Sequence, residues 1–272
     1  MDILELKKNA NEIRKGVITS VFNAKSGHPG GSLSSADILT YLFFEEMNID
    51  PKDPNKKDRD RFVLSKGHVA PVYYSALANR GFFPLEDLKT LRKLGSHLQG
   101  HPDKKGTPGV DMSTGSLGQG ISAAVGMALS AKLSNDNYRT YTLLGDGEIQ
   151  EGQVWEAAMC AAHYKLNNLT AFIDFNGLQI DGDITKVMNP CPIDKKFEAF
   201  GWNVLVIDGH NYEEIIDAIE KAKECKDKPT VVVCNTVKGK GVSFMENQAA
   251  WHGTAPSKEQ CEVALNELGG EN

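Results

Sequence analysis

Short apolar runs alternate with longer segments of helical periodicity over the second half of the chain. Runs such as Val204-Leu205-Val206-Ile207 and Val231-Val232-Val233 are apolar at consecutive positions, which is typical of parallel strands covered on both faces. Alternation of such strands with helices predicts an α/β fold, with a doubly wound, mostly parallel sheet flanked by helices. The predicted strands are residues 61–65, 140–144, 169–175, 203–207 and 230–235.

The N-terminal third is predicted to be mainly helical. A first helix covers residues 2–24 and ends before the break at residues 27–31, and a second runs from Ser35, as N-cap, to Met47. With no repeat and no clear linker, we expect one domain over residues 1–272. Further helices are predicted at 70–80, 84–94, 118–133, 151–165 and 211–224, and long loops at 177–192 and 238–256.

Composition narrows the class of protein without naming a function. A hydrophobic content of 40% with 24% charged residues is ordinary for a globular domain, and a net charge of −6 gives no reason to expect nucleic acid. No apolar run approaches the roughly 20 residues that cross a bilayer. The five cysteines are scattered, so we expect reduced thiols in a cytoplasmic protein, with Cys160 and Cys234 in the core.

Two strand ends carry candidate ligands for a metal and a phosphate. The strand at 140–144 leads into Gly145-Asp146-Gly147, and the strand at 169–175 leads into Asn176. Ligands of open α/β sheets bind at this carboxyl edge, and Mg²⁺ takes such hard oxygen ligands together with a diphosphate. Gly147 lets phosphate oxygens approach the backbone closely. The pattern resembles the thiamine diphosphate fingerprint, although a lone Gly-Asp-Gly is also common at turns.

Four of the seven histidines lie in turns that contain glycine or proline: His28, His68, His101 and His252. Rigid loops carry function more often than packing does, and histidine is the natural proton carrier near neutral pH. The alternative is a coincidence of unrelated turn residues. The other three histidines carry weaker signals, and His210 is expected to be a turn residue.

Taken together, these motifs resemble transketolase, in the order of that family and over nearly the whole chain. The resemblance is confined to the N-terminal, diphosphate-binding domain. A pyrimidine-binding domain is expected on a separate chain, as in the N-terminal subunit of a split transketolase. The motifs are Ser26-Gly27-His28-Pro29-Gly30, residues 58–65, Gly100-His101-Pro102, residues 115–120, Gly145-Asp146-Gly147, Ile180-Asp181-Gly182 and His252-Gly253.

The resemblance implies thiamine diphosphate and Mg²⁺ as cofactors and assigns residues to them. Asp146 and Asn176 would hold the metal through their side chains, and Leu178 through its carbonyl. Gly147 would donate its backbone N–H to phosphate. The implied cofactor-binding residues are His68, Gly115, Leu117, Gly147, Asn176, Ile180 and His252.

The implied catalytic residues are His28, His101, Glu151 and His252. His28 and His101 would face the substrate channel, where they would bond to sugar hydroxyls and help proton transfer. Glu151 would join a carboxylate network between two active sites; otherwise it is an acid favoured by the dipole at a helix N-terminus.

Two positions depart from the usual family pattern. Phe175 stands before Asn176 where Asn or Asp is more common, which leaves the metal ligand intact. Lys238-Gly239-Lys240-Gly241 is more basic than the corresponding loop of most transketolases and resembles that of deoxyxylulose-phosphate synthase. This loop either attracts phosphate or is a solvated loop.

The resemblance implies transfer of a two-carbon ketol unit from a ketose phosphate to an aldose phosphate. A C-terminal subunit would supply the glutamate that acts on the cofactor and most contacts to the substrate phosphate. We therefore expect this chain to be inactive alone, to bind the cofactor poorly, and to form a heterotetramer with two copies of each subunit. No nucleic acid or membrane partner is expected.

Three alternatives remain open. The first is a split transketolase that acts on an unusual sugar, such as a sulfo- or branched-sugar ketose, rather than on pentose phosphates. The second is an E1-type ketoacid dehydrogenase subunit, which shares the Gly-Asp-Gly and Asn pattern but lacks the two histidine-proline loops. The third is a non-catalytic thiamine diphosphate-binding domain that kept only the fold.

Overall fold

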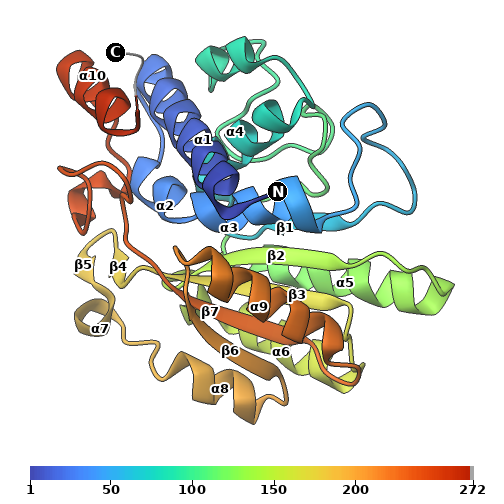
Figure 1. The fold of residues 1–272 in the computed structure, drawn as a ribbon. Helices are drawn as coiled ribbons and strands as arrows, with labels where there is room; N and C mark the ends of the chain where they lie inside the picture. The colour runs from blue at the N-terminus through green and yellow to red at the C-terminus, as the bar shows by residue number, and fades with distance from the viewer. Residues whose placement is uncertain (270–272) are drawn as a thin grey trace.

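The computed structural model describes residues 1–269, and positions 270–272 of the predicted domain lie outside them. A five-stranded parallel sheet with the order β1-β2-β3-β7-β6 forms its centre (Figure 1). The predicted α/β fold is therefore confirmed. The strands are β1 Arg61–Leu64, β2 Thr140–Gly145, β3 Leu169–Phe175, β6 Asn203–Asp208 and β7 Thr230–Asn235.

Helices cover both faces of the sheet and bury a separate core on each. The larger layer packs on side chains such as Phe62, Tyr141 and Phe172. It consists of α1 Ile3–Ala24, α2 Pro29–Ser34, α3 Ala36–Tyr41 with a π-helical turn Leu42–Glu46, α4 Ala70–Arg80, α9 Tyr212–Glu224 and α10 Lys258–Glu267.

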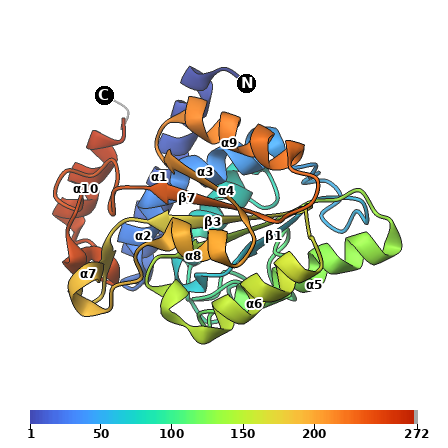
Figure 2. The same cartoon turned by 90° about the horizontal axis from the view of Figure 1, so that it is seen from below.

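The second layer packs on the alternate side chains of the same strands, among them Val63, Leu144 and Ile173. Figure 2 shows α5 and α6 running next to each other in this layer. Small residues of α5, such as Ala124 and Ala128, are fully buried there. The layer consists of α5 Gln119–Ser134, α6 Gly152–His163 and α8 Ile193–Ala199.

The strand register brings distant residues to one edge of the sheet. Gly145 lies opposite Asp174, and Phe175 lies opposite Asn235. Because all five strands are parallel, the residues that follow β2, β3 and β7 meet at the carboxyl edge. This edge collects the sequence-distant segments that begin at Asp146, Asn176 and Thr236.

Several sequence expectations are wrong in detail. The run 203–207 is not covered on both faces, since β6 is an edge strand and the side chain of Val206 is 55% exposed. The helix expected at 84–94 is only a 3₁₀ segment, Leu85–Thr90. Ser35 does not cap through its side chain, which instead donates to the Gly31 carbonyl. Cys160 is half-buried rather than in the core.

The break expected at residues 27–31 is shorter than predicted, because Pro29 already begins α2. Proline is well suited to the first turn of a helix, where its missing N–H has no partner to lose. Helices α8 and α10 were not predicted. The loop at 177–192 contains a small hairpin, β4 Leu178–Gln179 and β5 Gly182–Asp183, and the short helix α7 Ile184–Val187.

Within residues 1–269, none of the helices is long and apolar enough to cross a membrane. All five cysteines are free thiols, and Cys234 is buried as expected.

Candidate functional site

A cavity of about 380 Å³ opens at the carboxyl edge of the sheet. It collects nearly all of the predicted site residues, from six separate segments of the chain. The predicted residues that line it are His28, His68, Gly115, Leu117, Asp146, Gly147, Glu151, Asn176, Leu178, Ile180 and His252.

His101 is the one predicted residue outside this lining. Its ring nevertheless lies at the rim, because a Cβ atom added to Gly115 would come within 3.0 Å of it. Gly115 has a φ of +147°, a region that favours glycine. A glycine is therefore required at this position both for backbone geometry and for the close approach of the His101 ring.

The three predicted metal ligands lie close together behind β2 and β3. One carboxylate oxygen of Asp146 accepts the N–H of Gly177 at 2.7 Å, and the other accepts the N–H of Gly147 at 2.8 Å. The amide oxygen of Asn176 accepts the N–H of Leu178 at 3.1 Å. All three residues line the same cavity, and a carboxylate, an amide oxygen and a backbone carbonyl are oxygen ligands of the kind that Mg²⁺ prefers.

Asp146 is 3% exposed. Burial and the neighbouring charge of Asp174 raise the pKa of Asp146 to about 6, against the opposing effect of the Gly177 N–H. The positive charge of Lys238 lowers this pKa too, but it offsets burial and Asp174 only in part. A bound cation would supply the missing positive charge, so the residues present fit a magnesium site.

This donor set contains a single acidic residue, with an amide and a carbonyl. Accordingly, residues 1–269 contain no group of three or more His, Cys, Asp or Glu side chains that could hold a metal ion. A site completed by diphosphate oxygens does not need such a group, since Mg²⁺ is commonly held by one or two carboxylates plus substrate phosphates.

Gly147 leaves open space in front of the metal ligands. A Cβ atom added there would meet nothing nearer than the Gln179 side chain, at 3.6 Å. The protein itself therefore does not exclude a side chain at this position. A ligand that needs close approach to the backbone is a sufficient reason for the glycine.

Three of the four predicted histidines form a single cluster in the cavity. The ring centroids of His28 and His68 are 5.1 Å apart, and the His252 ring lies 5.4 Å from each of them. Nδ1 of His28 is buried and has no hydrogen-bond partner among residues 1–269. A buried polar atom without a partner is costly unless a ligand or water satisfies it.

The cluster is held in the neutral form. Burial lowers the pKa of His28 to about 4, with Arg92 adding to the effect. Burial and Lys238 lower the pKa of His252 to about 3, and burial lowers the pKa of His68 in the same direction. Neutral imidazoles can accept as well as donate hydrogen bonds, as contacts to hydroxyls and phosphate oxygens require.

The basic loop contributes Lys238 to the cavity. Its side chain is 2% exposed, and its ammonium lies 3.1 Å from the Leu178 carbonyl and 3.2 Å from Nδ1 of His252. Burial lowers the pKa of Lys238 to about 8. Lys238 is therefore a buried cation of the cavity lining and not part of a solvated loop, whereas Lys240 lies 3.7 Å from Glu246.

Sequence reasoning missed two buried charged residues beneath the cavity. Lys66 forms an ion pair with Asp174. Glu148 accepts from the Ser65 hydroxyl at 2.6 Å and from the N–H groups of Gly118 and Gly145, each at 3.0 Å. Only their positions beside His68 and after Asp146 in the chain could have drawn attention to them.

Arg92 was also missed; it does not line the cavity, but its charge acts on both His28 and His101. Its guanidinium donates to the Ser26 hydroxyl at 2.8 Å and packs against Gly100. After burial, Arg92 is the main cause of the lowered pKa values of both His28 and His101. It therefore adds positive charge beside the two histidines expected to face substrate.

Glu151 lines the cavity but is exposed in this chain. It precedes α6 as the N-cap residue, yet its side chain makes no capping hydrogen bond. The alternative expectation, an acid serving its own helix N-terminus, is therefore not supported by a capping bond.

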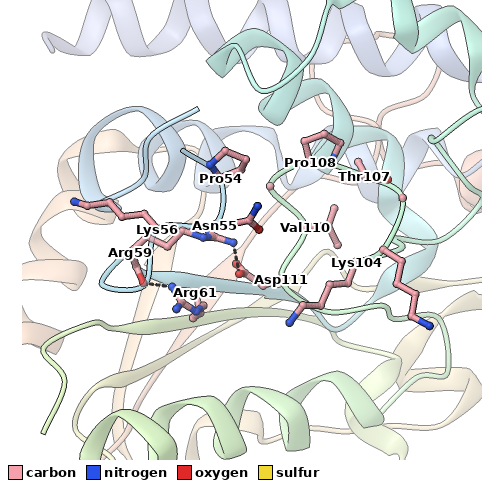
Figure 3. Close-up of a pocket in the computed structure, with 13 residues that line it drawn as sticks. Pro54, Asn55, Lys56, Arg59, Arg61, Lys104, Thr107, Pro108, Val110 and Asp111 are labelled. Carbon is pink, nitrogen blue, oxygen red and sulfur yellow. Dashed lines mark hydrogen bonds and ion pairs between the residues drawn. The ribbon is translucent and has the colours of Figure 1, made fainter. Parts of the chain in front are cut away.

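A second hollow, of about 360 Å³, lies at the opposite edge of the sheet near the start of β1 (Figure 3). It is rich in basic residues, among them Arg59, Arg61 and Lys104. Arg59 is paired with Asp111, and Arg61 donates to the Arg59 carbonyl, as the dashed lines in Figure 3 show. None of the predicted site residues lines this hollow.

Comparison with known proteins identifies the family. Residues 6–272 match the model of the transketolase, thiamine diphosphate binding domain. The chain is 48% identical over 266 residues to a 6-deoxy-6-sulfo-D-fructose transketolase subunit of Clostridium sp. (strain MSTE9), covering 97% of this chain and 96% of that protein. It is 44% identical over 268 residues to an apulose-4-phosphate transketolase subunit of Phocaeicola vulgatus, covering 98% and 94%.

The fold also matches solved transketolases. The structure of transketolase from Campylobacter jejuni superposes with a TM-score of 0.93 at 38% identity, covering 99% of this chain. This chain spans only 43% of that protein. Because the family model covers nearly the whole chain and two subunit-sized relatives span it, the expected transketolase-type enzyme subunit is confirmed: the chain belongs to the transketolase thiamine diphosphate-binding domain family.

Proposed function

We propose that this chain binds thiamine diphosphate and Mg²⁺ as the N-terminal subunit of a split transketolase that acts on an unusual sugar. The observation that carries the substrate class is the end-to-end similarity to subunits named for a sulfonated ketose and for apulose 4-phosphate. This supports the alternative reading of the sequence, a sulfo- or branched-sugar ketose, over the pentose phosphates of the main one.

Asp146, Asn176 and the Leu178 carbonyl would hold Mg²⁺, and the Gly147 N–H would bind a diphosphate oxygen. The bound cofactor supplies the electron sink for breaking and forming the carbon–carbon bond. His68 and His252, with Lys238 between Leu178 and His252, would surround the diphosphate. Gly115, Leu117 and Ile180 would line the remaining cofactor surface.

His28 and His101 would bond to sugar hydroxyls and carry protons, with neutral rings that can accept them. Arg92, which contacts Ser26 and packs on Gly100, would attract an anionic group of the sugar or aldehyde. Glu151 is exposed and therefore free to meet another subunit, where it would enter a carboxylate network.

The partner would be a C-terminal subunit that carries the pyrimidine-binding domain, in a heterotetramer with two copies of each chain. Two relatives that this chain spans to 96% and 94% of their length are themselves named as transketolase subunits, which supports a second chain that completes the site. The non-catalytic alternative is disfavoured because the candidate cofactor and catalytic residues are gathered at one cavity.

The test is reconstitution with the C-terminal subunit, thiamine diphosphate and Mg²⁺. Ketol transfer is then measured from a 6-deoxy-6-sulfo-ketose, apulose 4-phosphate and an ordinary ketopentose phosphate. The expected result is a higher kcat/KM for one of the first two donors, and no transfer by either chain on its own. A preference for the ketopentose phosphate would overturn the substrate class, and activity of the isolated chain would overturn the split site.

A further inference from the structure

His210 connects three segments of the fold, one of which leads into Lys238 of the cavity lining. It follows β6, and its Nδ1 lies 2.7 Å from a carboxylate oxygen of Asp37 on α3. Its Nε2 lies 2.9 Å from the backbone nitrogen of Val237, which follows β7. His210 lies in the turn after β6, as the sequence predicted, but its side chain is only 12% exposed and has partners on two other segments.

These two contacts fix the tautomer of the ring. A backbone N–H can only donate, so Nε2 must carry no hydrogen and act as the acceptor. The ring hydrogen then resides on Nδ1 and is donated to Asp37. A histidine oriented in this way by a carboxylate is a common means of holding one ring nitrogen in a fixed direction.

Asp37 is itself held from three sides. It is 5% exposed, pairs with Arg14 of α1, and accepts the Tyr212 hydroxyl of α9 at 3.3 Å. Burial alone would raise the pKa of Asp37, but Arg14 and the hydrogen bond from His210 outweigh it and lower the pKa. Asp37 therefore stays charged and immobile, and it anchors His210 to the helical layer.

The bond to Val237 acts on the next residue in the chain, Lys238. The Gly239 N–H beyond it donates to the Gly30 carbonyl at 2.9 Å, and Thr236 before it donates to Asp174. The backbone is thus tied down on either side of Lys238. Among residues 1–269, the bond between Val237 and His210 is the only one that joins the backbone of this turn to a histidine ring, whereas the Lys238 side chain itself contacts the His252 ring.

We propose that His210 is a positioning residue whose fixed Nε2 acceptor, held by Asp37, sets the backbone at Val237 and thereby aims the Lys238 ammonium into the cavity. The inference rests on the proposed function in one respect, that Lys238 faces the cofactor diphosphate. The placement of Lys238 by His210 does not depend on that function, because it is inferred from the contacts of His210 with Asp37 and Val237 alone.

The decisive variants are His210→Ala and His210→Gln in the full chain. Alanine removes the acceptor, whereas the glutamine amide can still accept from Val237 and donate to Asp37. His163→Ala is the matched control, since His163 is an exposed histidine on α6. Lys238→Met defines the effect of losing the ammonium itself.

The first measurement uses the chain without cofactor. We expect ¹⁵N NMR to show the Nδ1–H tautomer for His210, and the Val237 amide to exchange at least about 10-fold faster in His210→Ala, because its hydrogen bond protects it. Amine-labelling of Lys238, followed by mass spectrometry, should accelerate in parallel. An Nε2–H tautomer, or unchanged exchange and labelling in His210→Ala, would overturn the proposal.

The second measurement uses the complex reconstituted with the C-terminal subunit. We expect His210→Ala to weaken thiamine diphosphate binding about 10- to 100-fold, as outer partners of ligand sites do, with kcat at saturating cofactor changed far less. His210→Gln and His163→Ala should remain within about 3-fold of the wild type by the same reasoning. Equal loss in His210→Gln and His210→Ala would overturn the acceptor role.

The two measurements separate this inference from the proposed function. If the wild-type complex binds no thiamine diphosphate, the proposed function fails, while the tautomer, exchange and labelling results still decide the role of His210. If the complex binds the cofactor and His210→Ala binds it equally well, the positioning role fails and the proposed function stands.

Discussion

Two buried aspartates lie near the carboxyl ends of neighbouring strands, Asp146 just after β2 and Asp174 within β3, and the fold surrounds them in opposite ways. Asp174 is fully buried and accepts from Lys66, Ser34, Thr236 and Asn176. Burial alone would raise its pKa, but Lys66 and the hydrogen bonds lower it. Asp146 is nearly as buried, yet among residues 1–269 it accepts only from backbone N–H groups, and its pKa is raised to about 6.

The difference separates a group whose interactions are complete from one that is prepared for a ligand. Asp174 has an ion-pair partner within the chain, and its bond from the Asn176 amide at 3.0 Å turns the Asn176 oxygen away from it. Asp146 keeps lone pairs on both oxygens and forms no ion pair within residues 1–269, and the charge of Lys238 offsets its burial only in part. The ligand-free fold tolerates that arrangement because a carboxyl with a raised pKa can take up a proton, which removes the buried charge.

The largest expected effect comes from breaking the completed pair. Lys66→Met leaves the Asp174 charge buried without its partner, which should lower the free energy of unfolding by about 3–5 kcal/mol. Urea denaturation of the chain measures this. Asp174→Asn added to Lys66→Met is the control and should recover part of the loss; a single Lys66→Met variant as stable as the wild type would contradict the comparison.

Asp146→Asn should have the opposite pattern of effects, a large loss of cofactor binding and a small loss of stability. We expect Mg²⁺-dependent thiamine diphosphate binding by the reconstituted complex to fall by more than about 100-fold, beyond the loss typical of an outer partner. The free energy of unfolding of the ligand-free chain should fall by no more than about 1 kcal/mol, the value of one lost hydrogen bond. Calorimetry and urea denaturation measure the two quantities, and a loss of stability like that of Lys66→Met would make Asp146 structural.

A smaller effect is expected in the pH dependence of stability. The pKa of His28 is lowered from 6.5 to about 4, so the unfolded chain binds its proton more readily than the folded chain does. Its contribution to stability is complete above pH 6.5 and is lost as the pH falls toward 4. Urea denaturation at several pH values measures how the free energy of unfolding changes with pH. His28→Asn should make this change smaller between pH 6.5 and 4, while the control variant His163→Asn, at an exposed site, should not. An unchanged pH dependence in His28→Asn would show that His28 titrates normally.

The smallest effect is expected at Glu151. Its side chain is exposed, so Glu151→Gln should change the free energy of unfolding of the isolated chain by less than about 0.5 kcal/mol. If Glu151 meets another subunit, the same variant should weaken assembly with the C-terminal subunit in analytical ultracentrifugation. A large change in the isolated chain, without any change in assembly, would place its role within this chain instead.

Local signals account for what could be predicted. The strands at 140–144 and 169–175 are apolar runs that end in turn-forming or polar residues, and neighbouring residues suffice to recognise such runs. The edge position of β6 could not be recognised in the same way, since the run 203–207 is as apolar as a central strand. Helix α10 begins with a capping box at Ser257 and Gln260, a local signal that could have revealed this helix.

The sequence by itself determined the family motifs, the parallel α/β alternation and the candidate ligands Asp146 and Asn176. This is possible because the residue types that end a strand or form a turn are neighbours in the sequence. Only the tertiary structure decided which charges are satisfied. The partners of Asp174 include Lys66, 108 positions away, and Asp37 and His210 are 173 positions apart. Burial and pairing over such separations depend on how the strands align, and no local pattern encodes them.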